Sequence, residues 1–173
     1  MTSEQIESAR AQTHAFRDHY NYDTTYMEEM LDASPAGFAR FQAVTQMAGF
    51  GDSLPKDVPY VARIAAFAVV DCGPCLELTL KMGREAGVAA SVLHAARCDG
   101  AALPAELAEV RGYAAQIAAG ETPDDDEVQR LRDRYGSAGL VELALNIASS
   151  LIFPAVKRTL GHARSCSLTT FSV

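Results

Sequence analysis

Residues 60–86 read YVARIAAFAVVDCGPCLELTLKMGREA, and they carry the clearest structural signals in the chain. Residues 60–70 are apolar on every side except at Arg63, and a helix that is apolar all round is a buried one. Two cysteines with Gly and Pro between them then introduce a second stretch, which runs from about residue 75 to 86 and is followed by Gly87, a helix-ending signal. We therefore expect two helices joined at the cysteine pair, with the first helix in the core.

The rest of the chain carries the same helical character. Alternating runs of β-branched residues are missing, whereas the good helix formers Ala, Leu and Glu are abundant. A final helix is expected over residues 137–160. We predict an all-α chain with an N-terminal helical segment over residues 1–33 and a single all-α domain over residues 34–173.

Local signals place some helix ends and surface pairs. Ser34 followed by Pro35 is typical of a helix start, because the hydroxyl caps the helix and proline fits its first turn. Thr122 is expected to cap a later helix, since a proline and a run of acidic residues follow it. Glu77 is expected to face water and to pair with Lys81, four residues further along the same helix.

Composition excludes several classes of partner. The 173 residues are 49% hydrophobic and carry a formal net charge of −7, without a basic run that could follow nucleic-acid phosphates. The N-terminus lacks the apolar segment of a signal peptide. The most apolar stretch, residues 140–156, contains Glu142, Asn146 and Pro154, which favours a buried helix over a membrane span. We expect a cytoplasmic protein that binds neither nucleic acid nor membrane.

The cysteine pair, Cys72 and Cys75, has a chemical interpretation in that compartment. A reducing cytoplasm makes the four cysteines of the chain a poor disulfide framework, and a CxxC pair there indicates redox activity or metal binding. The first turn of a helix stabilises a thiolate through its free N–H groups and its dipole. Asp71 opposes this effect at Cys72, whereas Cys75 lies one turn further into the helix and is less affected.

The order of these pieces resembles the alkylhydroperoxidase D and carboxymuconolactone decarboxylase-like superfamily over residues 34–162. The segments that carry the resemblance are SPAGFARFQAV, then DSLPKDVPYVARIAAFAVVDCGPCLELTLKMGREAGV, and finally LPAELAEVRGYAAQIAAG, VQRLRDRYG and LVELALNIASSLIFPAVKRTLG. The resemblance implies an all-α fold that forms a homo-oligomer (dimer, trimer or hexamer). It also implies reduction of a small-molecule peroxide or disulfide without a cofactor, with Cys75 peroxidatic, Cys72 resolving and a dithiol protein as reductant.

Three positions depart from the pattern of the family's peroxidases. Tyr60 stands in place of a glutamate, Thr79 in place of a histidine, and Pro74 where a histidine often precedes the second cysteine. Neither Tyr nor Thr titrates near neutral pH, so the usual proton relay is missing. As a substitute, the Thr79 hydroxyl could donate to a Cys75 thiolate from four residues away. Arg63 could pair with that thiolate, with Tyr60 three residues before it completing the cluster.

Other interpretations of these residues stay open. Both cysteines could be inert buried thiols in a non-catalytic helical oligomer. Arg63 could instead pair with Asp57 or Asp71, and Thr79 and Tyr60 could be ordinary packing residues. A third possibility is a cofactor-free lyase or decarboxylase acting on a small organic acid, for which Arg63 is the one internal candidate to hold a carboxylate. A requirement for Arg63 but not for the cysteines would indicate that third function.

A metal site is a minor alternative for the same cysteines. His94 and Cys98 are four residues apart on an expected helix, so that Cys72, Cys75, His94 and Cys98 follow the spacing of some structural zinc sites.

The N-terminal segment has one further feature, in which two histidines, His14 and His19, lie near Tyr20, Tyr22 and Tyr26. A polar helix surface is the favoured interpretation, and a lid or a partner-facing surface is the alternative.

Overall fold

The protein was analysed as a computed structural model that describes residues 1–163, and within this range it contains eight helices and no strand. The prediction of an all-α chain is confirmed. The helices are α1 (Ser3–Tyr20), α2 (Thr25–Ala33), α3 (Pro35–Ala48), α4 (Asp57–Val69), α5 (Gly73–Glu85), α6 (Ala90–Arg97), α7 (Ala105–Ala118) and α8 (Asp125–Thr159).

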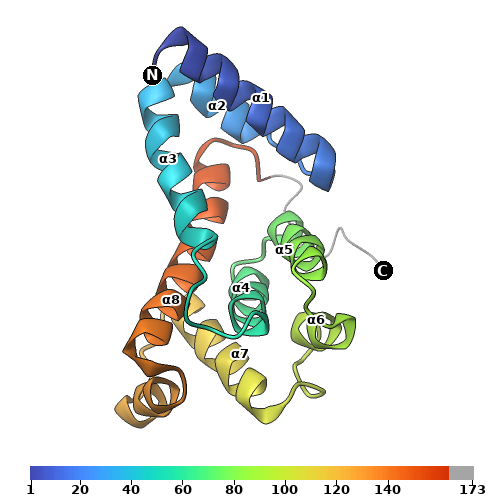
Figure 1. The fold of residues 1–173 in the computed structure, drawn as a ribbon, viewed down its shortest axis with the longest axis vertical. Helices are drawn as coiled ribbons and strands as arrows, with labels where there is room; N and C mark the ends of the chain where they lie inside the picture. Colours follow the sequence, from blue (N-terminus) through green and yellow to red (C-terminus); the bar gives the residue numbers. More distant parts are fainter. Residues whose placement is uncertain (164–173) are drawn as a thin grey trace.

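The apolar helix expected at residues 60–70 is α4, and it lies at the centre of the main core. It packs against α5, α6, α7 and α8, which surround it in Figure 1. Val61, Ala62 and Ile64 have no exposed surface. A helix that is apolar all round needs such cover on every side, so the sequence-based prediction of burial is confirmed.

The last helix consists of two parts that meet at Gly136. This residue has φ 72° and ψ 171°, a combination that essentially only glycine adopts. Gly136 therefore allows the chain to turn sharply between an exposed first part and an apolar second part. That division matches the helix expected from residue 137 onward.

One face of the apolar part of α8 packs against other helices in this fold. Among the described helices, α8 alone is long enough and apolar enough to cross a membrane, judged by length and composition only. The core helix of a soluble protein passes the same test, and α8 packs against α3, α4 and α7. Leu143, Asn146 and Ile147 are buried there, as expected for a core helix.

Two local predictions about helix starts have different outcomes. The Ser34 hydroxyl accepts a hydrogen bond from the backbone N–H of Gly37 at 3.1 Å, which confirms the predicted start of α3. The expected cap at Thr122 is wrong, because Asp124 caps α8 and accepts from the N–H of Glu127 at 2.7 Å. The carboxylate is both a stronger acceptor and a better complement to the helix dipole than a hydroxyl.

The predicted pair between Glu77 and Lys81 is also wrong. Glu77 pairs instead with Arg97 of α6 at 3.0 Å, and Lys81 donates to the backbone carbonyl of Tyr20 in α1. Both partners are distant in sequence, so the helical spacing of four residues could not reveal them.

Helices α1, α2 and α3 form an N-terminal arm at one end of the molecule (Figure 1). Helix α2 packs against both α1 and α3, and α3 lies along the second part of α8. The end of α1 is fastened to α5 by Glu85, which accepts from the Tyr20 hydroxyl at 2.6 Å and contacts the His19 ring at 2.7 Å. Burial and this contact raise the pKa of Tyr20 to about 12.

A Glu85→Gln change is expected to loosen the end of α1. The hydrogen bond from Tyr20 and the contact with His19 lower the pKa of Glu85, so the contact stabilises the fold above the usual pKa of glutamate and is lost as pH falls. Hydrogen exchange of the α1 amides after residue 14 should become roughly two to five times faster in the variant, as for loss of an exposed polar contact. Unchanged exchange relative to an exposed Glu4→Gln control would contradict this role.

Candidate functional site

The cysteine pair stands at the start of α5. Cys72 is the residue that precedes the first helical residue, and Cys75 lies in the first turn. The two are joined by a disulfide, with their Cα atoms 5.4 Å apart. Both are buried, Cys72 completely. The pair therefore lies at the positive end of the α5 dipole, the position in the helix that the sequence predicted.

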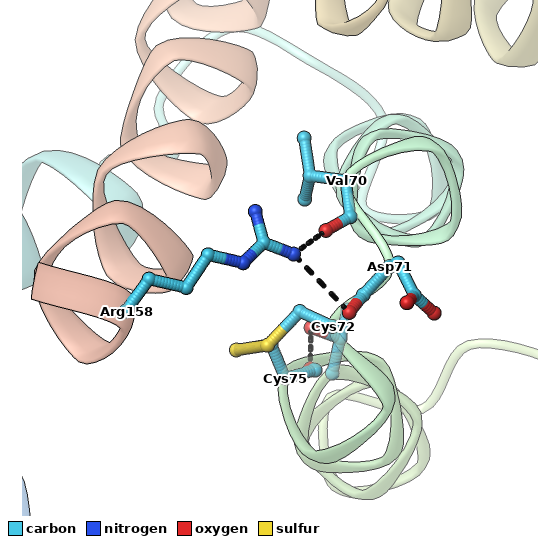
Figure 2. Close-up of a disulfide and its surroundings, with 6 residues drawn as sticks. Val70, Asp71, Cys72, Cys75 and Arg158 are labelled. Atoms are coloured by element: carbon cyan, nitrogen blue, oxygen red, sulfur yellow. Dashed lines mark hydrogen bonds between the residues drawn. A yellow bond between two sulfur atoms is a disulfide. The ribbon is translucent and has the colours of Figure 1, made fainter. Parts of the chain in front are cut away.

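The turn that leads into the disulfide is held from α8. Asp71 has φ 52°, in the left-handed region that Asp tolerates better than most residues. The guanidinium of Arg158 donates to the carbonyls of Val70 and Asp71, as Figure 2 shows. Arg158 thus joins the end of α4 to α8 beside the disulfide. This contact spans 88 residues, and no local sequence pattern predicts it.

An Arg158→Ala change is expected to speed reduction of the disulfide by dithiothreitol. The sulfur atoms are buried, so a reductant must wait for the turn to open or must enter from one side. Loss of the two hydrogen bonds should accelerate reduction roughly threefold to tenfold. Samples quenched with acid and alkylated with iodoacetamide show by mass spectrometry how much of the pair is reduced at each time, with Arg132→Ala on the exposed face of α8 as the matched control. Equal rates in the two variants would refute the role of Arg158.

One wall of a cavity of about 330 Å³ is formed by Cys75, whereas Cys72 does not line it. The cavity lies between the N-terminal arm and helices α4, α5 and α8. Apolar and aromatic side chains make most of its surface, among them Phe16, Tyr22, Tyr26, Phe38, Phe67, Leu78, Met82 and Phe153. The two cysteines therefore differ in access, because a small molecule in the cavity would meet Cys75 and not Cys72.

Arg63 lines the same cavity and is 8% exposed. Its Nε donates to the Pro59 carbonyl and its Nη1 to the Ala48 carbonyl, each at 3.2 Å. Burial lowers the pKa of Arg63, and the neighbouring Tyr60 opposes that shift. Over residues 1–163 Arg63 has no ion pair with a carboxylate, so the alternative partners Asp57 and Asp71 are not the ones that the structure uses.

Tyr60 contacts Arg63, whereas Thr79 lines the cavity beside Cys75. The Arg63 guanidinium lies over the Tyr60 ring, 4.3 Å from its centroid, so these two residues are in contact. The cluster that they were expected to form around a Cys75 thiolate stays a prediction. Thr79 lines the cavity, but its hydroxyl donates to the Cys75 carbonyl at 2.8 Å in the disulfide state. A threonine in a helix commonly makes this bond to the residue four positions earlier. A bond from Thr79 to a reduced Cys75 stays a prediction.

The four residues of the possible zinc site do not come together. His94 and Cys98 are exposed at the end of α6, with the His94 Nε2 atom 3.8 Å from the Cys98 Sγ atom. Cys72 and Cys75 are instead buried and bonded to each other. No group of three or more His, Cys, Asp or Glu side chains in the described part of the chain could hold a metal ion. The helical spacing of His94 and Cys98 reflects a surface position.

Sequence reasoning missed the contribution of the N-terminal arm to the cavity. Tyr22 and Tyr26 are buried and line the cavity together with Phe16, so the favoured interpretation of this region as a polar helix surface is wrong for the two tyrosines. Three tyrosines within seven residues, unusual for a polar helix, were the available signal. His14 and His19 remain on the outer side, where they contact Glu28 and Glu85.

Comparison with known proteins does not assign a family or a function to this site. The chain matches no family model, no curated protein and no solved structure. The chemical interpretation of the site therefore rests on its own side chains, above all on a cysteine pair of unequal access and on one buried arginine.

Proposed function

We propose that the chain is a thiol–disulfide oxidoreductase that reduces a peroxide, with Cys75 as the attacking thiolate and Cys72 as the resolving thiol. The observation that carries this proposal is the difference in access within a bonded pair. Cys75 lines the cavity, and Cys72 lies behind it without exposed surface. A peroxide that enters the cavity would therefore reach one sulfur, and the other would be in place for the second step.

The cycle has three balanced steps. The Cys75 thiolate attacks the peroxide, so that an S–O bond forms, the O–O bond breaks and an alcohol or water leaves, giving the sulfenic acid at Cys75. The Cys72 thiol then displaces water from that sulfenic acid and closes the disulfide. A dithiol donor, expected to be a protein, reduces the disulfide by thiol–disulfide exchange and is itself oxidised to a disulfide.

The side chains around Cys75 favour a thiolate without a general base. Cys75 lies in the first turn of α5, where the helix dipole lowers the pKa of a thiol. Arg63 adds a positive charge to the same cavity. A cation stabilises both the thiolate and the negative charge that develops on the departing oxygen. Proton transfer to that oxygen would come from water, since the family's glutamate and histidine are absent and Tyr60 does not line the cavity.

The remaining features of the proposal follow from the resemblance to the alkylhydroperoxidase D-like superfamily. We propose that the helices form that fold, that copies of the chain associate as a homo-oligomer, and that the protein works in the cytoplasm without a cofactor. A reducing compartment would return the disulfide to its reduced form between turnovers.

The test is peroxide consumption by the purified, reduced protein with dithiothreitol, using hydrogen peroxide and an organic hydroperoxide. A Cys72→Ser/Cys75→Ser double variant sets the background. Because Cys98 is exposed and could react non-specifically, Cys98→Ser is the matched control and should keep full activity. Consumption that equals the double variant's would refute the proposal and favour a non-catalytic helical oligomer whose cysteines are relics.

A further inference from the structure

The cavity combines an apolar wall with a single charge. Six helices contribute to it, and aromatic or aliphatic side chains form most of its surface, among them Phe16 of α1, Tyr26 of α2, Phe38 of α3, Phe67 of α4, Leu78 of α5 and Phe153 of α8. Arg63 is the one charged side chain among the described lining residues. Sites for small molecules commonly have this composition, in which a mostly apolar surface binds and a few polar groups orient the ligand.

Arg63 carries a charge that the described residues do not neutralise. Its hydrogen bonds to Pro59 and Ala48 use Nε and one N–H of Nη1, both with neutral carbonyl acceptors. The Ala48 carbonyl belongs to the last turn of α3, whose dipole offers a partial negative charge. No carboxylate within residues 1–163 accepts a hydrogen bond from the guanidinium, and its one side-chain partner there is the neutral Tyr60. A buried guanidinium is ordinarily paired with an anion, and here the cavity is where an anion could reach it.

We propose that this cavity binds an aliphatic monocarboxylate, with the carboxylate on Arg63 and the hydrocarbon chain along the aromatic wall. The planar guanidinium fits a carboxylate better than a spherical anion. A volume of about 330 Å³ suits a chain of roughly ten heavy atoms, since a methylene group is about as large as a water molecule, which occupies about 30 Å³ in the liquid. This binding needs no thiol chemistry, so it stands independently of the proposed peroxidase activity.

The first test compares two ligands on the unaltered protein by isothermal titration calorimetry. Decanoate and decanol share a ten-carbon chain and differ in charge at neutral pH. Decanoate is expected to bind once per chain and about ten to a hundred times more tightly than decanol, the range expected for a charge-assisted hydrogen bond. Equal affinity for the two ligands, or no saturable binding of decanoate, would overturn the proposal.

The second test locates the carboxylate with variants. Arg63→Gln should reduce the decanoate affinity to that of decanol, Arg63→Lys should retain part of the preference, and both should bind decanol like the unaltered protein. Unchanged binding of decanol also shows that the variants are folded and keep the cavity intact. Arg40→Gln, on the exposed face of α3, removes the same charge outside the cavity and should bind decanoate normally. A preference for decanoate that survives in Arg63→Gln would refute the role of Arg63.

A third variant separates this inference from the proposed activity. The Cys72→Ser/Cys75→Ser protein is expected to bind decanoate with the affinity of the reduced protein, whether or not the cysteines reduce peroxides. In the unaltered reduced protein, bound decanoate should slow alkylation of Cys75 by iodoacetamide severalfold, because Cys75 and Arg63 line the same cavity. Alkylation that is unaffected at saturating decanoate would place the ligand elsewhere.

Discussion

A Cys75→Ser variant, reduced beforehand and given no dithiol, is expected to consume no peroxide above background. Under the same conditions Cys72→Ser is expected to consume a single equivalent and to stop as a sulfenic acid at Cys75, whereas the unaltered protein stops as the disulfide. The two residues are only three positions apart and are bonded to each other. Their different positions relative to the cavity nevertheless separate their roles, since Cys75 lines it and Cys72 does not.

The chemical reason is that each variant stops a different step. A serine hydroxyl at position 75 is a far weaker nucleophile toward oxygen than a thiolate, so no sulfenic acid forms. A serine at position 72 leaves the attacking thiolate in place but cannot displace water from the sulfenic acid. Cys75 would then remain in its oxidised, unresolved form.

The measurement uses pre-reduced protein without added dithiol, because a small dithiol could itself reduce the sulfenic acid. Peroxide loss is counted per chain, and dimedone followed by mass spectrometry identifies the oxidised residue. In Cys72→Ser the label should appear on Cys75, and in Cys75→Ser the pair should remain unlabelled. Labelling of Cys72 in the second variant would reverse the assigned roles, and labelling confined to the exposed Cys98 would reject the pair as the reactive site.

The parts of this site that lie close together in sequence could be predicted, because local geometry determines them. Helix propensity and the Gly-Pro insert indicated that the cysteines stand in a first helical turn, and the spacing of three residues brought Tyr60 against Arg63. Uniform apolarity indicated that α4 is buried. In each case the physical cause acts within about two turns of helix.

The parts contributed by distant segments could not be predicted. The cavity exists because side chains of α1 and α2 line it together with those of α4 and α5, and no periodic pattern in residues 1–33 specifies that arrangement. Arg158 reaches the turn before Cys72 from α8, and Glu77 finds its partner on α6 instead of on its own helix. The spacing rules describe one helix at a time, whereas these contacts depend on how the helices are arranged.

The loop that precedes α4 shows how such a distant contact supports the site. Glu142 of α8 is completely buried, and its Oε2 accepts hydrogen bonds from three successive backbone N–H groups. The donors are Asp52, Ser53 and Leu54, at 2.9, 2.7 and 3.3 Å. Asn146, one turn further along α8, donates to the Phe50 carbonyl in the same loop at 3.3 Å. The loop joins the end of α3 to the start of α4, the helix that carries Arg63. The guanidinium of Arg63 donates to one carbonyl in each of these helices.

A Glu142→Ala change is expected to lower the free energy of unfolding by about 3 kcal/mol, because a buried acceptor with three backbone donors is lost and the loop can recover only part of that bonding from water. Glu142→Gln keeps a carbonyl acceptor and should lose about half as much. Urea unfolding followed by circular dichroism gives these values, with Asp133→Ala on the exposed part of α8 as the control. Because the loop sets the position of Ala48 relative to Arg63, the alanine variant should also bind decanoate more weakly while still folded. A loss below 1 kcal/mol in Glu142→Ala would mean that the loop holds its conformation, and with it the Arg63 contacts, without this anchor.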